Sequence, residues 1–202
     1  RVVLVKANQA IQTLEKYRSV FDQALTNLSA LEFEDLVTLS DVVTVIQRTE
    51  MVLKIQREIE KYISELGSEG RLIKMQLEEL VNNVREEGIL LIEDYISEEL
   101  EEDTSDPEKV LESLTDWSSD EILTLNTISK ALGYSGSLNA LDETVSPRGY
   151  RIMRKIPRLP MPVIENLVDY FENLQAIIRA SVDELDDVDG IGEVRAQAIK
   201  DG

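Results

Sequence analysis

The sequence lacks cysteine and histidine altogether, and it has only one tryptophan and five prolines among 202 residues. Without cysteine, the chain cannot form a disulfide scaffold. The absence of both residue types also removes the usual zinc ligands and the usual nucleophile–base pairs of hydrolases. There is no run of 18 apolar residues and no secretory signal pattern, so neither a membrane span nor a membrane partner is expected. Much enzymatic chemistry is therefore excluded, and a binding function is favoured.

Negative charge dominates the composition, with 40 acidic and 21 basic residues and a net charge of −19. Residues 1–146 contain 13 basic and 30 acidic residues, whereas residues 147–202 contain 8 and 10. Residues 148–158 include no acidic residue. They include five basic residues, which we call the basic stripe: Arg148, Arg151, Arg154, Lys155 and Arg158. This distribution predicts an acidic body beside a local surface that can contact phosphate.

Apolar residues recur at three- and four-residue spacing through the first half of the chain, which is typical of amphipathic helices. The pattern predicts three long helices, separated by breaks at residues 29–38 and 67–70, with Ser40-Asp41 as the cap of the second. Arg18 occupies an expected apolar position, and Gly88 marks a bend or a close contact. The predicted fold class is all-α: an elongated antiparallel three-helix bundle followed by a small helical domain. A self-associating coiled coil is the alternative, although the short breaks favour helices that pack within one chain.

The densest acidic run covers residues 98–106. Crowded carboxylates repel one another, so the run is interpreted as a solvated linker, with a loop that binds a divalent metal as the alternative. The predicted organisation is a helical spine domain over 1–100, an acidic linker over 101–106 and a DNA-binding helical domain over 107–202 that folds alone. Within that last domain, Ser118 and Glu121 match a capping box that starts a further helix.

Two glycines flank Ile191 near the end of the chain, within residues 188–192. Ser181 and Glu184 match a capping box ahead of this turn, and helical spacing resumes after it, which predicts a helix, a hairpin and a helix over 182–200. A turn with so little side-chain bulk exposes the N–H groups at the start of the next helix, where an anion can bind. The candidate DNA contacts in this motif are Gly190, Ile191, Gly192, Arg195 and Lys200. The alternative is a turn whose glycines serve only close helix packing.

This pattern resembles the second half of a helix-hairpin-helix DNA-binding module, whose hairpin reads hydrophobic-x-Gly-hydrophobic-Gly. In that family, the hairpin N–H groups and the following helix N-terminus bind a backbone phosphate. Residues 156–160 repeat the hydrophobic spacing 32 positions earlier, which predicts a first motif over about 150–171 and a tandem arrangement. The earlier hairpin lacks the glycines. Either Arg158 supplies a charged contact in their place, or the repeat is purely structural.

Several strings, in two separate parts of the chain, resemble the bacterial DNA integrity scanning protein family. They are residues 7–10, 13–18, 147–151, 155–160 and 188–192. The resemblance covers the linker and C-terminal DNA-binding domains of that family and nearly the whole of this chain.

The resemblance implies a diadenylate cyclase in the full-length family protein, which condenses two ATP molecules into cyclic di-AMP with Mg²⁺ or Mn²⁺. The Asp-Gly-Ala and Arg-His-Arg motifs of that domain are absent, so no catalytic residue, metal or cofactor is expected in this chain. The resemblance also implies a homo-octamer for the full-length protein, and for this fragment alone a monomer is one of the states that the sequence leaves open. It further implies branched or junction DNA as the partner, a role in a DNA damage checkpoint, and a location in the bacterial cytoplasm at the nucleoid.

Two other functions compete with DNA binding. The first is a helical protein-interaction module, because helix-hairpin-helix domains also bind proteins and an acidic chain suits a basic partner. The second is an enzyme that uses Asp and Glu carboxylates with a metal. No clustered acidic motif lies beside a recognisable pocket pattern, so DNA binding without chemistry of its own remains the favoured prediction.

Overall fold

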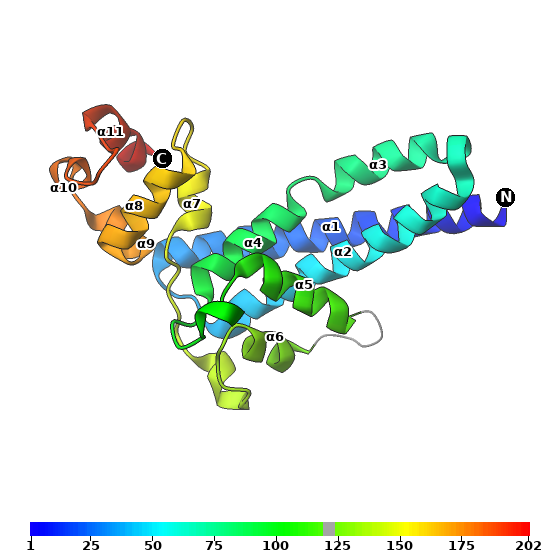
Figure 1. Cartoon of the computed structure of the whole chain (residues 1–202), viewed down its shortest axis with the longest axis horizontal. Helices are drawn as coiled ribbons and strands as arrows, with labels where there is room; N and C mark the ends of the chain where they lie inside the picture. Colours follow the sequence, from blue (N-terminus) through cyan, green and yellow to red (C-terminus); the bar gives the residue numbers. More distant parts are fainter. Residues whose placement is uncertain (119–123) are drawn as a thin grey trace.

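The computed structural model describes residues 1–118 and 124–202, and the regular elements in these two ranges are helical, which confirms the all-α fold class (Figure 1). The elongated part of the molecule, which we call the spine, consists of α1 (Val2–Glu34), α2 (Leu39–Leu66), η1 (Gly67–Gly70), α3 (Arg71–Val81), α4 (Val84–Tyr95), η2 (Glu102–Thr104), α5 (Pro107–Ser118), α6 (Leu125–Ala131) and η3 (Leu138–Asp142). The smaller part, which we call the tip, consists of α7 (Tyr150–Arg154), α8 (Met161–Phe171), α9 (Leu174–Arg179), α10 (Val182–Asp186) and α11 (Glu193–Asp201). The tip and the N-terminus lie at opposite ends of the spine (Figure 1).

The helices α1 and α2 pack side by side and antiparallel, as their apolar seams predict. The seam of α1 buries Ile11, Leu14 and Phe21, and the helix continues past the predicted break to Glu34. Of the predicted cap Ser40-Asp41, only Asp41 takes part in capping, because the N-cap of α2 is Thr38. The reason is that the Asp41 carboxylate can reach back to accept the Thr38 N–H at 2.9 Å, which completes a capping box.

The third long helix of the prediction is two helices, α3 and α4, because the chain breaks at Asn82 and Asn83. Asn83 adopts the left-handed conformation with φ 65°, which asparagine tolerates better than most residues. The guanidinium of Arg18 donates hydrogen bonds to the carbonyl oxygens of Leu80 (2.9 Å) and Asn82 (2.7 Å). Arg18 therefore stands in an apolar seam because it satisfies carbonyls that the break leaves open.

Gly88 marks a close helix contact and not a bend. A Cβ atom at this position would lie 2.7 Å from the Cγ2 atom of Thr49 on α2, so a larger side chain would push α4 away from α2. Gly88 lies inside α4, which continues through it to Tyr95. Of the two roles predicted for this glycine, the structure selects the contact.

The domain boundary predicted at residues 101–106 was wrong, because the next two helices complete the spine. Val110, Leu111 and Leu114 of α5, with Ile128 and Leu132 after the acidic run, are buried in the same hydrophobic core as α1 and α2. A separate core starts only at Ile152 and belongs to the tip. A piece beginning at residue 107 would thus remove two helices from the core that they cover, so we no longer expect 107–202 to fold alone.

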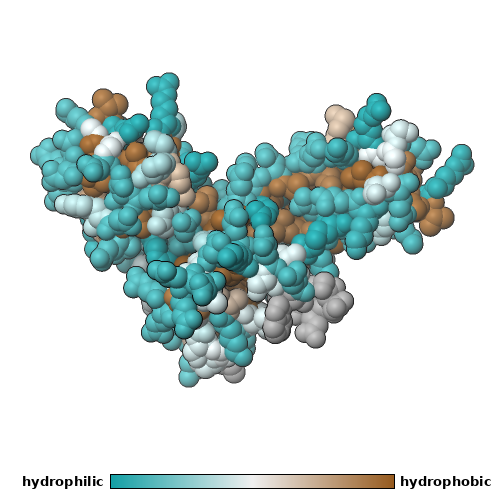
Figure 2. Space-filling model, viewed as in Figure 1, coloured by the Kyte–Doolittle hydropathy of each residue, from teal (hydrophilic) through white to brown (hydrophobic). Residues whose placement is uncertain are grey.

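The acidic run itself lies at the surface, with the short turn η2 within it. Ser118 is the last residue of α5, and Glu121, its partner in the predicted capping box, lies outside the described residues. Within the described ranges, the helices offer no apolar stretch sufficient to cross a bilayer, and no group of three or more acidic side chains is arranged to hold a metal ion. Figure 2 shows a mainly hydrophilic surface over the tip and a hydrophobic seam along the part of the spine that points away from the tip.

Candidate nucleic-acid interface

The second hairpin of the tip joins α10 to α11 and has the geometry that the sequence predicts. Ser181 accepts a hydrogen bond from the Glu184 N–H at 3.1 Å, and the Glu184 carboxylate accepts the Ser181 N–H, which confirms the capping box. The chain then turns at Gly190, where φ is 86°. Ile191 is buried in the tip core, so this candidate residue anchors the hairpin and presents no side chain to a ligand.

The two glycines of this hairpin have different roles. A Cβ atom on Gly190 would lie 3.0 Å from the Cγ2 atom of Val163 on α8, so this glycine serves both the positive φ and the packing of one motif against the other. A Cβ atom on Gly192 would have no neighbour within 4 Å, and its φ of −96° suits any residue. Gly192 is thus the glycine that keeps the surface of the hairpin open.

The start of α11 offers backbone donors to an anion. The Ala196 N–H is the first in the helix to bond back, to the Gly192 carbonyl at 2.9 Å. The N–H groups of residues 193–195 precede any intrahelical acceptor, as at every helix start. The surrounding residues Gly192, Glu193 and Val194 are exposed, and the helix dipole favours a negative ligand at this end.

The first hairpin, between α7 and α8, repeats the second at a distance of 32 residues, as the sequence predicts. The Ile156 N–H donates to the Met153 carbonyl at 3.1 Å, and the Val188 N–H donates to the Leu185 carbonyl at the same distance. Arg158, at φ 63°, occupies the left-handed position that Gly190 occupies in the second hairpin. This conformation is uncommon and unfavourable for a residue with a Cβ atom, so the packing around the hairpin must hold Arg158 in it.

The two hairpins nevertheless differ in the donors they present. Pro160 and Pro162 have no N–H group, and the N–H groups of Val163 and Ile164 both donate to the Pro160 carbonyl. The first hairpin therefore cannot bind an anion through its backbone as the second can. It instead carries exposed cationic side chains: Arg154, Lys155 and Arg158.

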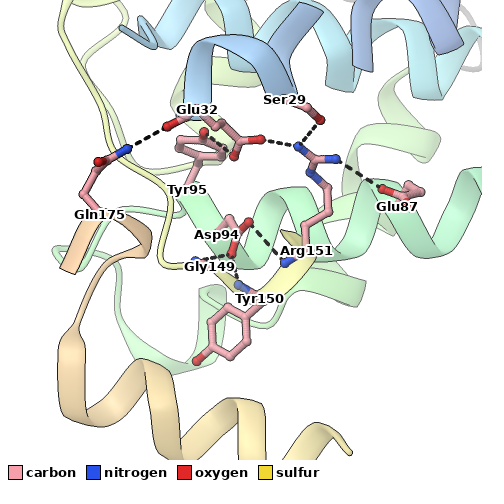
Figure 3. A network of polar contacts seen from close by, with 9 residues as sticks. All are labelled: Ser29, Glu32, Glu87, Asp94, Tyr95, Gly149, Tyr150, Arg151 and Gln175. Carbon is pink, nitrogen blue, oxygen red and sulfur yellow. Dashed lines mark hydrogen bonds and ion pairs between the residues drawn. The ribbon is translucent and has the colours of Figure 1, made fainter. Parts of the chain in front are cut away.

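The prediction that the whole basic stripe faces a ligand was wrong for Arg151. Its guanidinium is fully buried, forms an ion pair with Glu32 of α1 and donates to the Ser29 hydroxyl at 3.0 Å (Figure 3). Arg148 is also turned inward, where it donates to the carbonyl oxygens of Glu93 (2.9 Å) and Ile96 (2.6 Å). Both residues tie the tip to the spine because they face α1 and α4 from the start of α7.

Asp94, at the end of α4, holds the N-terminus of α7 in place. Its carboxylate accepts the N–H groups of Gly149 (3.0 Å), Tyr150 (2.7 Å) and Arg151 (3.3 Å), as a capping residue would (Figure 3). Burial and the nearby charge of Glu32 raise the pKa of the Asp94 carboxyl to about 7, although the hydrogen bonds from Tyr150 and Gly149 and the charge of Arg151 act in the opposite direction.

Glu32 is the second buried carboxylate of this joint. It accepts the Tyr95 hydroxyl at 2.8 Å, and its own carbonyl oxygen accepts the Gln175 side-chain amide at 2.8 Å (Figure 3). Burial raises the pKa of the Tyr95 phenol, which keeps it a donor. Glu32 and Asp94 are not among the site residues predicted from the sequence. The available signal was a carboxylate on the helical spacing of an apolar seam, since Glu32 follows Leu28 by four residues.

The remaining predicted contacts, Arg195 and Lys200, lie on α11 and are exposed. Arg195 donates to the Gly190 carbonyl at 2.7 Å, which braces the turn, and Lys200 donates to the Ile178 carbonyl at 2.7 Å. Each retains further donors for a ligand. The acidic neighbours of this hairpin are Asp186, Asp187, Asp189 and Glu193. The second hairpin thus combines backbone donors with negative surroundings, whereas the first combines cationic side chains with few backbone donors.

Comparisons with known proteins agree with this division of the chain. The family model described as the DisA bacterial checkpoint controller linker region matches residues 1–141, and the model of the helix-hairpin-helix motif matches residues 173–202. The first match ends between the two hydrophobic cores, which supports the corrected boundary.

The similar curated proteins include the DNA integrity scanning protein DisA of Carboxydothermus hydrogenoformans, at 60% identity over all of this chain and 56% of that protein. The protein of the same name from Bacillus subtilis is 54% identical over 99% of this chain and 54% of its own length. That of Clostridium acetobutylicum is 54% identical over all of this chain and 55% of its own length. The chain therefore spans about half the length of these relatives.

Proposed function

We propose that this chain, which belongs to the DisA family of DNA integrity scanning proteins, binds DNA through its tip and carries that tip on an acidic spine. The observation that carries the proposal is that the two hairpins offer complementary kinds of hydrogen-bond donor. One presents the open backbone donors at the start of α11, and the other presents Arg154, Lys155 and Arg158. Both kinds of donor suit phosphate oxygens, and contacts to phosphate carry no information on base sequence.

The spine restricts where DNA can approach. Residues 1–146 carry a net charge of −17, which repels the phosphate backbone, whereas residues 147–202 carry a net charge of only −2. Contact is then confined to the tip. Because one core holds both hairpins, the phosphates that contact them must lie at a fixed separation and angle. A branched DNA offers arrangements of phosphates that a straight duplex lacks. We therefore assign branched or junction DNA as the preferred ligand.

The activity of the longer protein is a further part of this proposal. The relatives are named for DNA integrity scanning, and they are almost twice as long as this chain. In a full-length member we assign cyclic di-AMP synthesis, with ATP and Mg²⁺ or Mn²⁺, to a cyclase domain outside this chain. The same proposal includes assembly of the full-length protein as a homo-octamer and action at the nucleoid in the bacterial cytoplasm. DNA bound at the tip would then act on synthesis through the spine.

Fluorescence anisotropy with a labelled four-way junction and a linear duplex of the same arm sequences tests the DNA proposal. We expect this chain to bind both at low salt and the junction more tightly. A folded chain that binds neither DNA would leave the protein-interaction function as the better explanation. Equal affinity for the two DNAs would retain DNA binding and remove the preference for branches.

A further inference from the structure

The tip contains a cavity of about 330 Å³, which we call the basic groove, beside the first hairpin. Its floor is apolar and includes Ile152, Ile156 and Ile177, and Ile178 lies at its surface. Its volume is at the lower end of the range for sites that hold small ligands. Phe33, from the end of α1, also lines the groove and is 52% exposed although it is a large aromatic residue. The spine thus contributes an aromatic ring to a cavity of the tip.

Two ammonium groups accompany this apolar surface. Lys155 and Lys200 both line the groove, and no Asp or Glu side chain is among its lining residues. Lys155 is also the neighbour of Arg154 in the exposed cationic part of the first hairpin. The groove is therefore continuous with the surface that we propose for phosphate contact. A ligand that is flat and apolar in its centre and anionic at its edges fits this combination.

The repeat in the tip supplies an internal comparison. A shift of 32 residues takes Lys155, Ile156 and Pro157 to Asp187, Val188 and Asp189, which line a second cavity at the equivalent place. We call this cavity the acidic groove, and its other lining residues include Asp169 and Tyr170. Tyr170 is 58% exposed, so each groove has an accessible aromatic residue. The two grooves share their position in the repeat and differ in charge, which makes one suitable for nucleic acid and the other unsuitable.

We propose that the basic groove receives one unpaired nucleotide of a branched DNA, with its base against Phe33 and the aliphatic floor and its flanking phosphates near Lys155 and Lys200. The proposal rests on the proposed function and names the DNA feature that this site takes. Only an unpaired base has both faces free, and bases stack on aromatic side chains with little regard to their identity. An acidic peptide is the competing occupant, but the groove continues into the first hairpin, which favours the ligand that the hairpins hold.

Three four-way junctions with identical arms test the proposal. One is fully paired, one carries a single unpaired thymidine at the branch point, and one carries an abasic residue at that point. We expect the thymidine junction to bind about tenfold more tightly than the abasic junction, a factor within the range for base–aromatic stacking. The Phe33→Ala variant should lose most of this factor. Because Phe33 is half exposed, circular dichroism should show an unchanged helical content.

The matched control is Tyr170→Ala, which removes the exposed aromatic residue of the acidic groove. This variant should retain the preference for the unpaired thymidine. Equal binding of the thymidine and abasic junctions by the unaltered chain would overturn the proposal while leaving DNA binding by the tip intact. Loss of the preference in Tyr170→Ala as well as in Phe33→Ala would also overturn it. Absence of binding to all three junctions would instead contradict the proposed function.

A competition experiment tests what the groove holds. Free thymidine monophosphate is expected to displace the thymidine junction from the protein and to leave the abasic junction bound. The same displacement by an acidic phenylalanine-containing peptide alone would assign the groove to a peptide.

Discussion

The guanidinium of Arg151 forms an ion pair with the carboxylate of Glu32, and both side chains are fully buried where the tip meets the spine. A charge taken out of water is stabilised only while its partner remains. This pair joins α7 of the tip to α1 of the spine, and Asp94 of α4 caps the same short helix. The orientation of the tip is therefore set by buried polar contacts in addition to apolar packing.

Arg151→Met should lower the free energy of unfolding by about 3–5 kcal/mol, because it leaves the Glu32 carboxylate buried without its counter-charge. Arg154→Met removes an exposed arginine from the same helix and should change stability by less than about 0.5 kcal/mol. Urea unfolding followed by circular dichroism measures both. A loss below about 1 kcal/mol for Arg151→Met would show that the joint does not depend on this pair.

Asp94 predicts a pH dependence of stability. Its pKa in the folded chain is about 7, above the value of 3.8 for an unperturbed aspartate, so the folded state holds this proton more tightly than the unfolded state. The contribution of Asp94 is then fully present below about pH 4 and is lost as the pH rises to about 7. The loss over this window is on the order of 4 kcal/mol at most. Unfolding curves of Asp94→Asn should lack this component, and an identical pH profile for both proteins would contradict the assignment.

The glycines of the second hairpin should separate folding from binding. Gly190→Ala should destabilise the chain by about 1–2 kcal/mol, because φ is positive and Val163 lies 3.0 Å from the added Cβ atom. Gly192→Leu should leave stability nearly unchanged and weaken DNA binding, because its side chain would project from the open surface beside the free N–H groups. Thermal unfolding and anisotropy on the same samples distinguish the two effects. Full DNA affinity in a folded Gly192→Leu variant would remove this hairpin from the interface.

The exposed cations of the first hairpin should act as phosphate contacts. Arg154→Ala combined with Lys155→Ala should weaken binding to all arm sequences alike and reduce the slope of log K against log salt by about two. The matched control is Arg71→Ala combined with Lys74→Ala, which removes the same charge from exposed positions on the spine. That control should leave the slope unchanged. Similar losses in the two double variants would mean that the spine also contacts DNA.

Hydrophobic periodicity and turn residues are local properties of the sequence. They correctly predicted the features that depend on interactions between residues close in sequence. The helical seams, the capping box of Ser181 and the 32-residue repeat of the hairpins are all present in the structure. In each case the signal lies within a few residues of the feature. The positive φ of Arg158 could be expected only once the two hairpins were aligned, since arginine itself does not favour it.

Features that depend on contacts between residues distant in sequence could not be predicted from local patterns. Residues 98–106 have the composition of a linker, yet the helices that follow belong to the spine, because the apolar face of α5 packs against α2 and α4. Arg148 and Arg151 belong to a basic stripe in sequence and to a buried joint in space, since their partners lie more than fifty residues away. Arg18 is explained only by the break at Asn82.

The salt dependence of DNA binding tests the central claim most directly. The tip offers the backbone donors of α11 and five exposed cations from the predicted contacts: Arg154, Lys155, Arg158, Arg195 and Lys200. About three to five phosphates should be neutralised, which predicts a slope of roughly −3 to −5 for log K against log salt on duplex DNA. The same slope and nearly equal affinities should be found for unrelated sequences, because phosphates and not base edges are contacted. A nearly flat salt dependence together with strong preference for one linear sequence would contradict the account.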